Sequence, residues 1–132
     1  MNYIRFAIHE KDDKSGREKG LFSAMSDLLF ADCLYEYERE LEQSLYSWFK
    51  KNLRVPAVLS SKSNHCKNVN AISWFKVSAK EHIDNFMQYA RILEAHDVNV
   101  VRLLTDKPGT IVYEDDYQIA AVPFADTFKK FI

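Results

Sequence analysis

The strongest chemical signal in the chain is an uneven distribution of charge. Residues 43–80 contain no Asp or Glu, although acidic residues make up 19 of the 132 residues. The same window carries seven cationic side chains between two aromatic pairs. Cations interleaved with aromatic rings are typical of a surface that contacts phosphates and stacks on bases. These residues are Lys50, Lys51, Arg54, Lys62, Lys67, Lys76 and Lys80, with the pairs Trp48–Phe49 and Trp74–Phe75.

A structural interpretation of this window competes with the functional one. The aromatic pairs fall where a hydrophobic core needs large side chains, and the lysines can form an ordinary solvated face. The whole chain has a net charge of −1, whereas nucleic-acid-binding domains are usually basic. The core interpretation is therefore favoured. A nucleic acid or an acidic protein is the partner that the cations would suit.

A second polar cluster stands at residues 113–118, which read Tyr-Glu-Asp-Asp-Tyr-Gln. Neighbouring carboxylates can hold a divalent cation, since hard cations take oxygen ligands. A tight turn explains the same residues, because Asp tolerates the backbone angles of a turn and bonds locally to the chain. No third carboxylate follows at a suitable spacing. The turn interpretation is favoured, and no metal is predicted.

The other nucleophilic and titratable residues form no catalytic motif. The four histidines show no His-x-x-x-His spacing, and Cys33 and Cys66 are far apart with no Cys-x-x-Cys pair. His65 stands beside Cys66, but a catalytic base is normally distant from its nucleophile in sequence. Gly-x-Ser-x-Gly, phosphate-loop and dinucleotide-binding motifs are absent from the sequence as well. The sequence therefore leans against an enzyme and predicts no cofactor.

Hydrophobic periodicity predicts the elements that must position these residues. Ser78 and Glu81 have the spacing of a capping box, which places a helix start beside them. Pro108–Gly109 and Asp115–Asp116 are expected to form turns, the second of them within a hairpin. The predicted helices cover 21–29, 34–52 and 79–95, the strands 2–9, 71–77, 98–104, 110–114 and 117–122, and the loops 10–19 and 60–70.

The helix over 34–52 has the clearest pattern. Its expected buried stripe is apolar, and acidic residues occupy the rest of its first half, where they favour the helix dipole. Lys50 and Lys51 stand at its end, ahead of Pro56. The expected stripe consists of Leu34, Tyr37, Leu41, Leu45, Trp48 and Phe49.

Together these elements predict one α+β domain over residues 1–132. The expected architecture is a single mixed, mostly antiparallel sheet of about five strands with three helices packed on it. A strand, a helix and a strand with short connections favour one parallel pair with a right-handed crossover. The composition, 47% hydrophobic and 28% charged, is that of a folded globular protein. No apolar run approaches the length of a membrane span, so no membrane contact is predicted, and the two widely spaced cysteines favour a cytoplasmic protein.

Several segments together resemble a family of small uncharacterised bacterial proteins. The resemblance runs from about residue 16 to 124, and its most specific part is the closing stretch. It implies a compact bacterial cytoplasmic domain and transfers no activity or catalytic residue. The segments are Gly20-Leu-Phe, Trp48-Phe49 with Pro56, Ser73-Trp-Phe-Lys76, Lys107-Pro-Gly-Thr-Ile-Val-Tyr-Glu-Asp115 and Gln118-Ile-Ala-Ala-Val-Pro-Phe124.

These observations favour a small binding or regulatory module with a basic, aromatic-lined surface. One alternative is a metal-dependent hydrolase or nuclease that uses the carboxylates of residues 114–116. Another is a protein-interaction module whose basic surface meets an acidic protein. The predicted contacts are Lys62, Lys67, Trp74, Lys76, Tyr113, Glu114 and Gln118.

Overall fold

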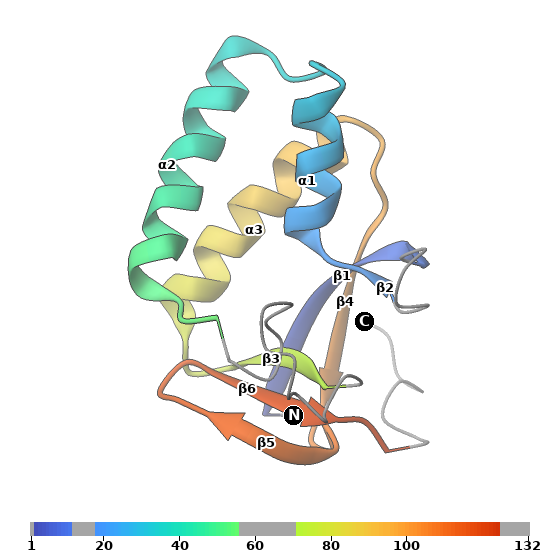
Figure 1. Cartoon of the computed structure of the whole chain (residues 1–132), viewed down its shortest axis with the longest axis vertical. Helices are drawn as coiled ribbons and strands as arrows, with labels where there is room; N and C mark the ends of the chain where they lie inside the picture. Colours follow the sequence, from blue (N-terminus) through green and yellow to red (C-terminus); the bar gives the residue numbers. More distant parts are fainter. Residues whose placement is uncertain (1, 12–17, 56–70, 125–132) are drawn as a thin grey trace, which may run out of the picture.

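Three helices pack on one sheet in the computed structural model of the chain (Figure 1), which confirms the predicted α+β class. The structure describes residues 2–11, 18–55 and 71–124. The predicted loop over 60–70 lies outside them, as does most of the loop over 10–19. The elements are β1 (Tyr3–Lys11), β2 (Glu18–Lys19), α1 (Leu21–Phe30), α2 (Glu36–Asn52), β3 (Ile72–Lys76), α3 (Lys80–Ala95), β4 (Val100–Thr105), β5 (Thr110–Glu114) and β6 (Gln118–Val122).

Strand β1 is the centre of the sheet. β4 pairs along one of its edges, from Tyr3 opposite Thr105 to Ile8 opposite Val100. The other edge is shared, because β3 pairs with the start of β1 and β2 with its end. β3 then continues the sheet through β6 to β5.

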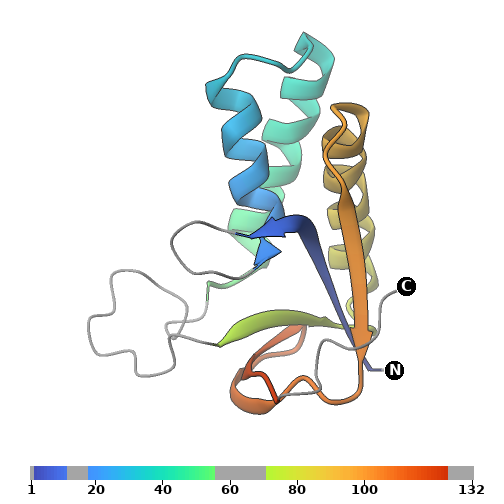
Figure 2. The ribbon, with the colours of Figure 1, turned by 90° about the vertical axis from the view of Figure 1, so that its right-hand side faces the viewer.

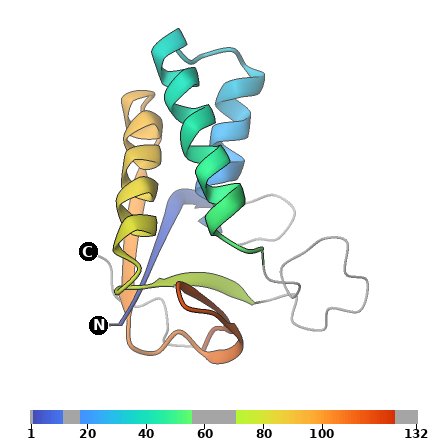
Figure 3. The ribbon, with the colours of Figure 1, turned by 90° about the vertical axis from the view of Figure 1, so that its left-hand side faces the viewer.

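Residues 5–7 of β1 pair with no described strand on this shared edge. β3 meets β1 only where Tyr3 lies opposite Lys76 and Ile4 opposite Phe75. Beyond these pairs the two strands diverge, as Figures 2 and 3 show from opposite sides. We call the opening between residues 5–7 and β3 the β1–β3 fork.

The expected parallel pair is wrong. All five strand pairings that the structure describes are antiparallel. β3 and β4, which flank α3 in sequence, run in the same direction, but β1 lies between them and pairs with both. Local patterning predicts each strand but not this insertion, because the pairing partners of β1 are distant in sequence.

The two faces of the sheet have different cores. The face toward the helices carries the larger cluster, in which Phe6 and Phe75 meet Phe49 and Phe86 of the helices. The opposite face carries a smaller cluster around Trp74. Paired strand residues share a face, so the pairing of Trp74 with Ile119 and of Phe75 with Gln118 assigns the β3–β6 residues to their sides. The smaller cluster contains Ile72, Trp74, Leu103, Ile119, Ala121 and Tyr3.

The buried face of α2 differs from the expected apolar stripe. Tyr37 is 69% exposed and Leu41 is 39% exposed, whereas Glu38 and Glu42 are buried in line with Leu45. Polar partners in neighbouring segments of the same chain allow α2 to turn this face toward the core. The Glu38 carboxylate accepts the Tyr35 N–H at 2.9 Å and lies 2.8 Å from His96 Nε2, beyond the end of α3.

The capping box predicted at Ser78 and Glu81 is absent. The N-cap of α3 is Ala79, which makes no side-chain capping bond, because a turn at residues 77–78 precedes it and places Ser78 one position too early. The helix itself begins within a residue of the predicted start. An acidic side chain caps α2 instead, through the bond from Tyr35 N to Glu38.

The hairpin of β5 and β6 forms as predicted, around residues 115–116. Gly109, just before it, has φ +120°, a conformation that other residues rarely adopt. A Cβ at this position would overlap the carbonyl group of Val122. Gly109 is therefore required for β5 to start beside the end of β6.

Candidate functional site

The seven predicted contact residues do not form one surface. The sheet register divides five of them between its two faces, because paired residues share a face and neighbours alternate. Trp74, Lys76 and Glu114 lie on the face away from the helices, Tyr113 and Gln118 lie on the face toward them, and Lys62 and Lys67 lie outside the described residues.

Two of these contacts neutralise each other. Lys76 Nζ lies 2.6 Å from Glu114 Oε2, across the sheet from β3 to β5. The hydrogen bond to Glu114 raises the pKa of Lys76 above its ordinary value. Lys76 is thus part of an ion pair, which weakens its case as a phosphate contact.

Trp74 is a core residue rather than a stacking platform. It is 1% exposed and packs with Ile72 and Ile119. Phe49 and Phe75 are buried as well, at 3% and 8% exposed. We call residues 43–80, which lack Asp and Glu, the acid-free window. These three of its aromatic residues pack in the core, as the structural interpretation predicts.

Asp115 is the centre of the hairpin cluster, and its bonds are local. Its carboxylate accepts hydrogen bonds from the backbone N–H groups of Tyr117 and Gln118 at 2.8 and 2.9 Å, and from the Tyr113 hydroxyl at 2.8 Å. Burial by itself would raise the pKa of Asp115, but these bonds outweigh it and lower the pKa. The bond to Asp115 also raises the pKa of Tyr113. These contacts support the turn interpretation of residues 113–118.

A metal centre finds no such support. In the described ranges, no group of three His, Cys, Asp or Glu side chains is placed to hold one ion. Asp115 directs its oxygens at donors of the turn, and Glu114 pairs with Lys76.

The β1–β3 fork opens into a pocket of about 220 Å³, which we call the fork pocket. Its wall is mostly apolar and aromatic, with contributions from both layers of the fold. The described residues that line it are Ile4, Arg5, Phe6, Gly20, Leu21, Phe22, Leu53, Ser73, Trp74, Phe75, Phe86 and Gln118.

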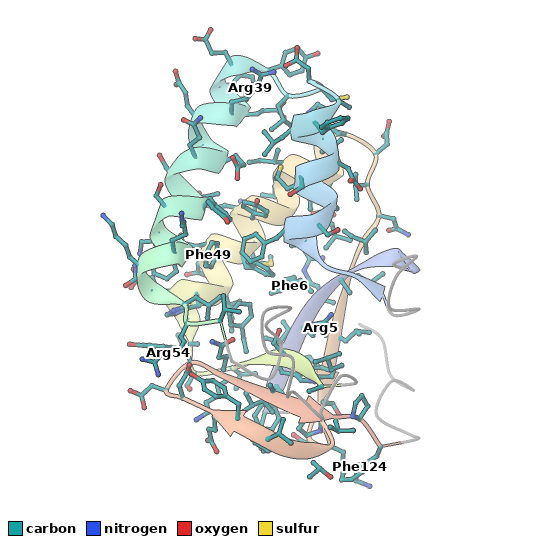
Figure 4. The ribbon with its side chains drawn as sticks, viewed as in Figure 1. Arg5, Phe6, Arg39, Phe49, Arg54 and Phe124 are labelled. Atoms are coloured by element: carbon teal, nitrogen blue, oxygen red, sulfur yellow. The ribbon has the colours of Figure 1, made fainter. Side chains whose placement is uncertain are left out.

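Arg5 is the one charged side chain among these described lining residues. It stands on β1 at the fork, next to Phe6 (Figure 4), and its guanidinium donates a hydrogen bond to the Ser73 carbonyl at 2.9 Å. That bond spans the opening, where the strands make no backbone pairing. Gln118 Nε2 donates to the carbonyl of Arg54 and, at 3.3 Å, to Asp115 Oδ2.

The start of α1 also borders the fork pocket, at Gly20, Leu21 and Phe22. Helix N–H groups at this end carry partial positive charge, which adds to that of Arg5. Gly20 has φ −78°, an ordinary extended conformation. No described atom lies within 4 Å of where its Cβ would stand. Gly20 therefore has room for a larger side chain.

Four cations of the acid-free window remain exposed in the described chain. They lie at the end of α2 and the start of α3, which are joined where His82 Nε2 lies 2.7 Å from the Asn52 carbonyl oxygen. These cations are Lys50, Lys51, Arg54 and Lys80.

Comparison with known proteins finds no matching family model, curated protein or solved structure. The resemblance to a family of small bacterial proteins therefore stays a prediction. No helix within the described ranges is long and apolar enough to cross a membrane.

Trp74 and Gln118 were predicted contacts, but the pocket that they line was not predicted. One signal was present, since Arg5 interrupts the apolar and aromatic residues of segment 3–8. A cation in such a strand needs a polar partner, and here Ser73 provides one from a strand 68 positions away.

Proposed function

We propose that the protein is a small binding module whose site is the fork pocket. Its ligand is a small organic anion with a flat apolar body, such as an aromatic carboxylate. The observation that carries the proposal is the guanidinium of Arg5 within an aromatic-lined pocket of about 220 Å³.

The chemistry of the lining supports this ligand class. Small-molecule sites combine an apolar wall with a few polar groups that fix orientation. Phe22, Phe75 and Phe86 offer ring surface, and Arg5 offers the planar donor geometry that suits a carboxylate. Two of the contacts predicted from the sequence, Trp74 and Gln118, line the fork pocket.

Binding rather than catalysis fits the described lining. It contains one hydroxyl, that of Ser73, and neither a histidine nor a carboxylate that could activate it. The alternative of a metal-dependent hydrolase rests on residues 114–116, of which Asp115 serves the turn and Glu114 an ion pair. We also propose a cytoplasmic location, because the two cysteines are widely spaced in sequence. One of them, Cys33, is an exposed free thiol.

A calorimetric titration with benzoate, against benzamide as its neutral isostere, tests the proposal. We expect wild-type protein to bind benzoate, and Arg5→Gln to weaken that binding about tenfold or more, because an ionic hydrogen bond is lost. A thermal melt of the variant checks that it keeps the fold. Equal binding of benzoate and benzamide would contradict the proposed role of Arg5.

Gly20→Leu provides a steric control. Gly20 lines the fork pocket, its backbone has an ordinary extended conformation, and a Cβ there would meet open space. We expect this variant to fold and to lose benzoate binding. Undiminished benzoate binding by folded Gly20→Leu would mean that benzoate binds outside the fork pocket. No benzoate binding by the wild type would contradict the proposal.

The exposed cations at the end of α2 favour a second candidate function, contact with a nucleic acid or an acidic protein. If Lys50, Lys51 and Arg54 meet phosphates, affinity for single-stranded DNA falls with salt at a log–log slope near −2, from about 0.7 per contact. Replacing Lys50 and Lys51 by Gln should flatten the slope in a fluorescence-anisotropy titration. A folded wild type that binds no DNA at low salt would leave the acidic protein as the partner.

A further inference from the structure

A second pocket holds a buried carboxylate that the proposed function does not use. Glu42 of α2 is only 6% exposed. It lines a pocket of about 300 Å³ between α1 and α2, together with Ser23 and Ser26 of α1, Tyr46 of α2 and Tyr89 of α3. Phe22 and Leu29 complete the described lining. We call this the helix pocket.

Glu42 has little to balance its charge. Among the described residues, its carboxylate has one hydrogen-bond partner, the Tyr89 hydroxyl, which donates at 3.1 Å. Burial and the nearby Glu42 both raise the pKa of Tyr89, so this hydroxyl keeps its proton and donates. None of the ion pairs in the described chain involves Glu42. A buried charge is normally compensated by a cation or by several donors.

Glu38, one turn earlier on α2, shows the usual compensation. It is 4% exposed, and its carboxylate meets both His96 Nε2 and the N–H of Tyr35. Glu38 thus has two partners, one of them a histidine, whereas Glu42 has the Tyr89 hydroxyl alone among the described residues. The difference leaves room for an external cation at Glu42.

The rest of the helix pocket suits an ammonium group. The Ser23 and Ser26 hydroxyls can accept N–H bonds, and Phe22, Tyr46 and Tyr89 add aromatic rings, a kind of group that attracts cations. Lys50 Nζ already lies 5.7 Å from the centre of the Tyr46 ring.

We propose that the helix pocket binds a small primary alkylammonium ion, with Glu42 as its anionic partner. The carboxylate and the two serine hydroxyls accept its N–H bonds, and the aromatic rings contact its alkyl chain. This site is independent of the fork pocket, although Phe22 lines both.

An NMR titration with n-butylammonium chloride tests the proposal, with n-butanol and KCl as matched controls. We expect saturable shifts of the amide signals of residues 22–26, 42–46 and 89 with n-butylammonium, and no saturable shifts at these residues with either control. Absence of saturable shifts in the folded wild type, or equal shifts with n-butanol, would overturn the proposal.

Glu42→Gln removes the charge and retains an oxygen that can accept the Tyr89 hydroxyl. We expect it to weaken n-butylammonium binding about tenfold or more, since a hydrogen bond to a charged group is lost. Glu40→Gln, an exposed site on α2, is the matched control and should bind as the wild type does. Equal weakening in both variants would show general surface electrostatics and overturn the assignment of Glu42.

Discussion

The β5–β6 hairpin and the β1–β3 fork, two parts of one sheet, use polar side chains in opposite ways. In the hairpin, Asp115 bonds to donors only two or three positions away. In the fork, Arg5 meets Ser73, 68 positions away, and both line a pocket. Polar residues that are close in sequence can satisfy one another locally, whereas a cavity needs segments that the fold brings together. The hairpin cluster is thus explained by its turn, and the fork is the better candidate site.

Substitution of the two described glycines, Gly109 before the hairpin and Gly20 at the fork, should give the largest difference in stability between the two regions. Gly109→Ala forces a Cβ against the Val122 carbonyl at φ +120°, so we expect it to destabilise the protein by at least about 3 kcal/mol. Gly20→Ala at the fork meets open space and should change stability by less than about 1 kcal/mol. Urea denaturation of both variants measures the difference. Similar stabilities would contradict the described contact between Gly109 and β6.

The next largest effect is expected at the hairpin turn. Asp115→Ala removes the acceptor for two backbone N–H groups and for the Tyr113 hydroxyl, which should cost about 1–3 kcal/mol. Asp116 is exposed, and its replacement by Ala should cost less than about 0.5 kcal/mol. Denaturation curves that place Asp116→Ala below Asp115→Ala in stability would argue against Asp115 as the centre of the turn.

A smaller effect concerns pH. The folded state lowers the pKa of Asp115, so its ionised form stabilises the protein above the unfolded pKa, and this contribution is lost as pH falls through the folded pKa. We expect the melting temperature to fall below about pH 4. Asp115→Asn should make the fall shallower. An unchanged acid profile in this variant would mean that Asp115 is not the carboxyl responsible.

Glu38 should account for part of the remaining acid sensitivity. Burial by itself would raise the pKa of Glu38, but the hydrogen bonds from His96 and Tyr35 outweigh it and lower the pKa. Arg5 stays charged throughout this range. Benzoate binding should therefore weaken in acid only as the ligand becomes protonated or the protein unfolds.

Local patterning predicted most elements but not their arrangement. The strand over 71–77 and the hairpin at 115–116 follow from alternation and turn residues, which are local properties. The insertion of β1 between β3 and β4 depends on pairing between distant strands, so the predicted parallel pair was wrong. The buried face of α2 was misassigned because the burial of Glu38 depends on His96, which belongs to another element.

The candidate site was predicted less well for the same reason. Gln118 was named for its place in a polar cluster, and only the fold brings it to a pocket with Arg5. Trp74 was named for its ring, which is buried. No spacing along the chain encodes the opening between β1 and β3, since it forms where β3 turns away after two residue pairs.

A crystal structure of the protein with bound benzoate tests the central claim most directly. The account predicts electron density for benzoate in the fork pocket, with its carboxylate about 3 Å from the Arg5 guanidinium and its ring against the phenylalanines. Benzoate bound at another location, or an unoccupied fork pocket in crystals of saturated protein, would contradict it.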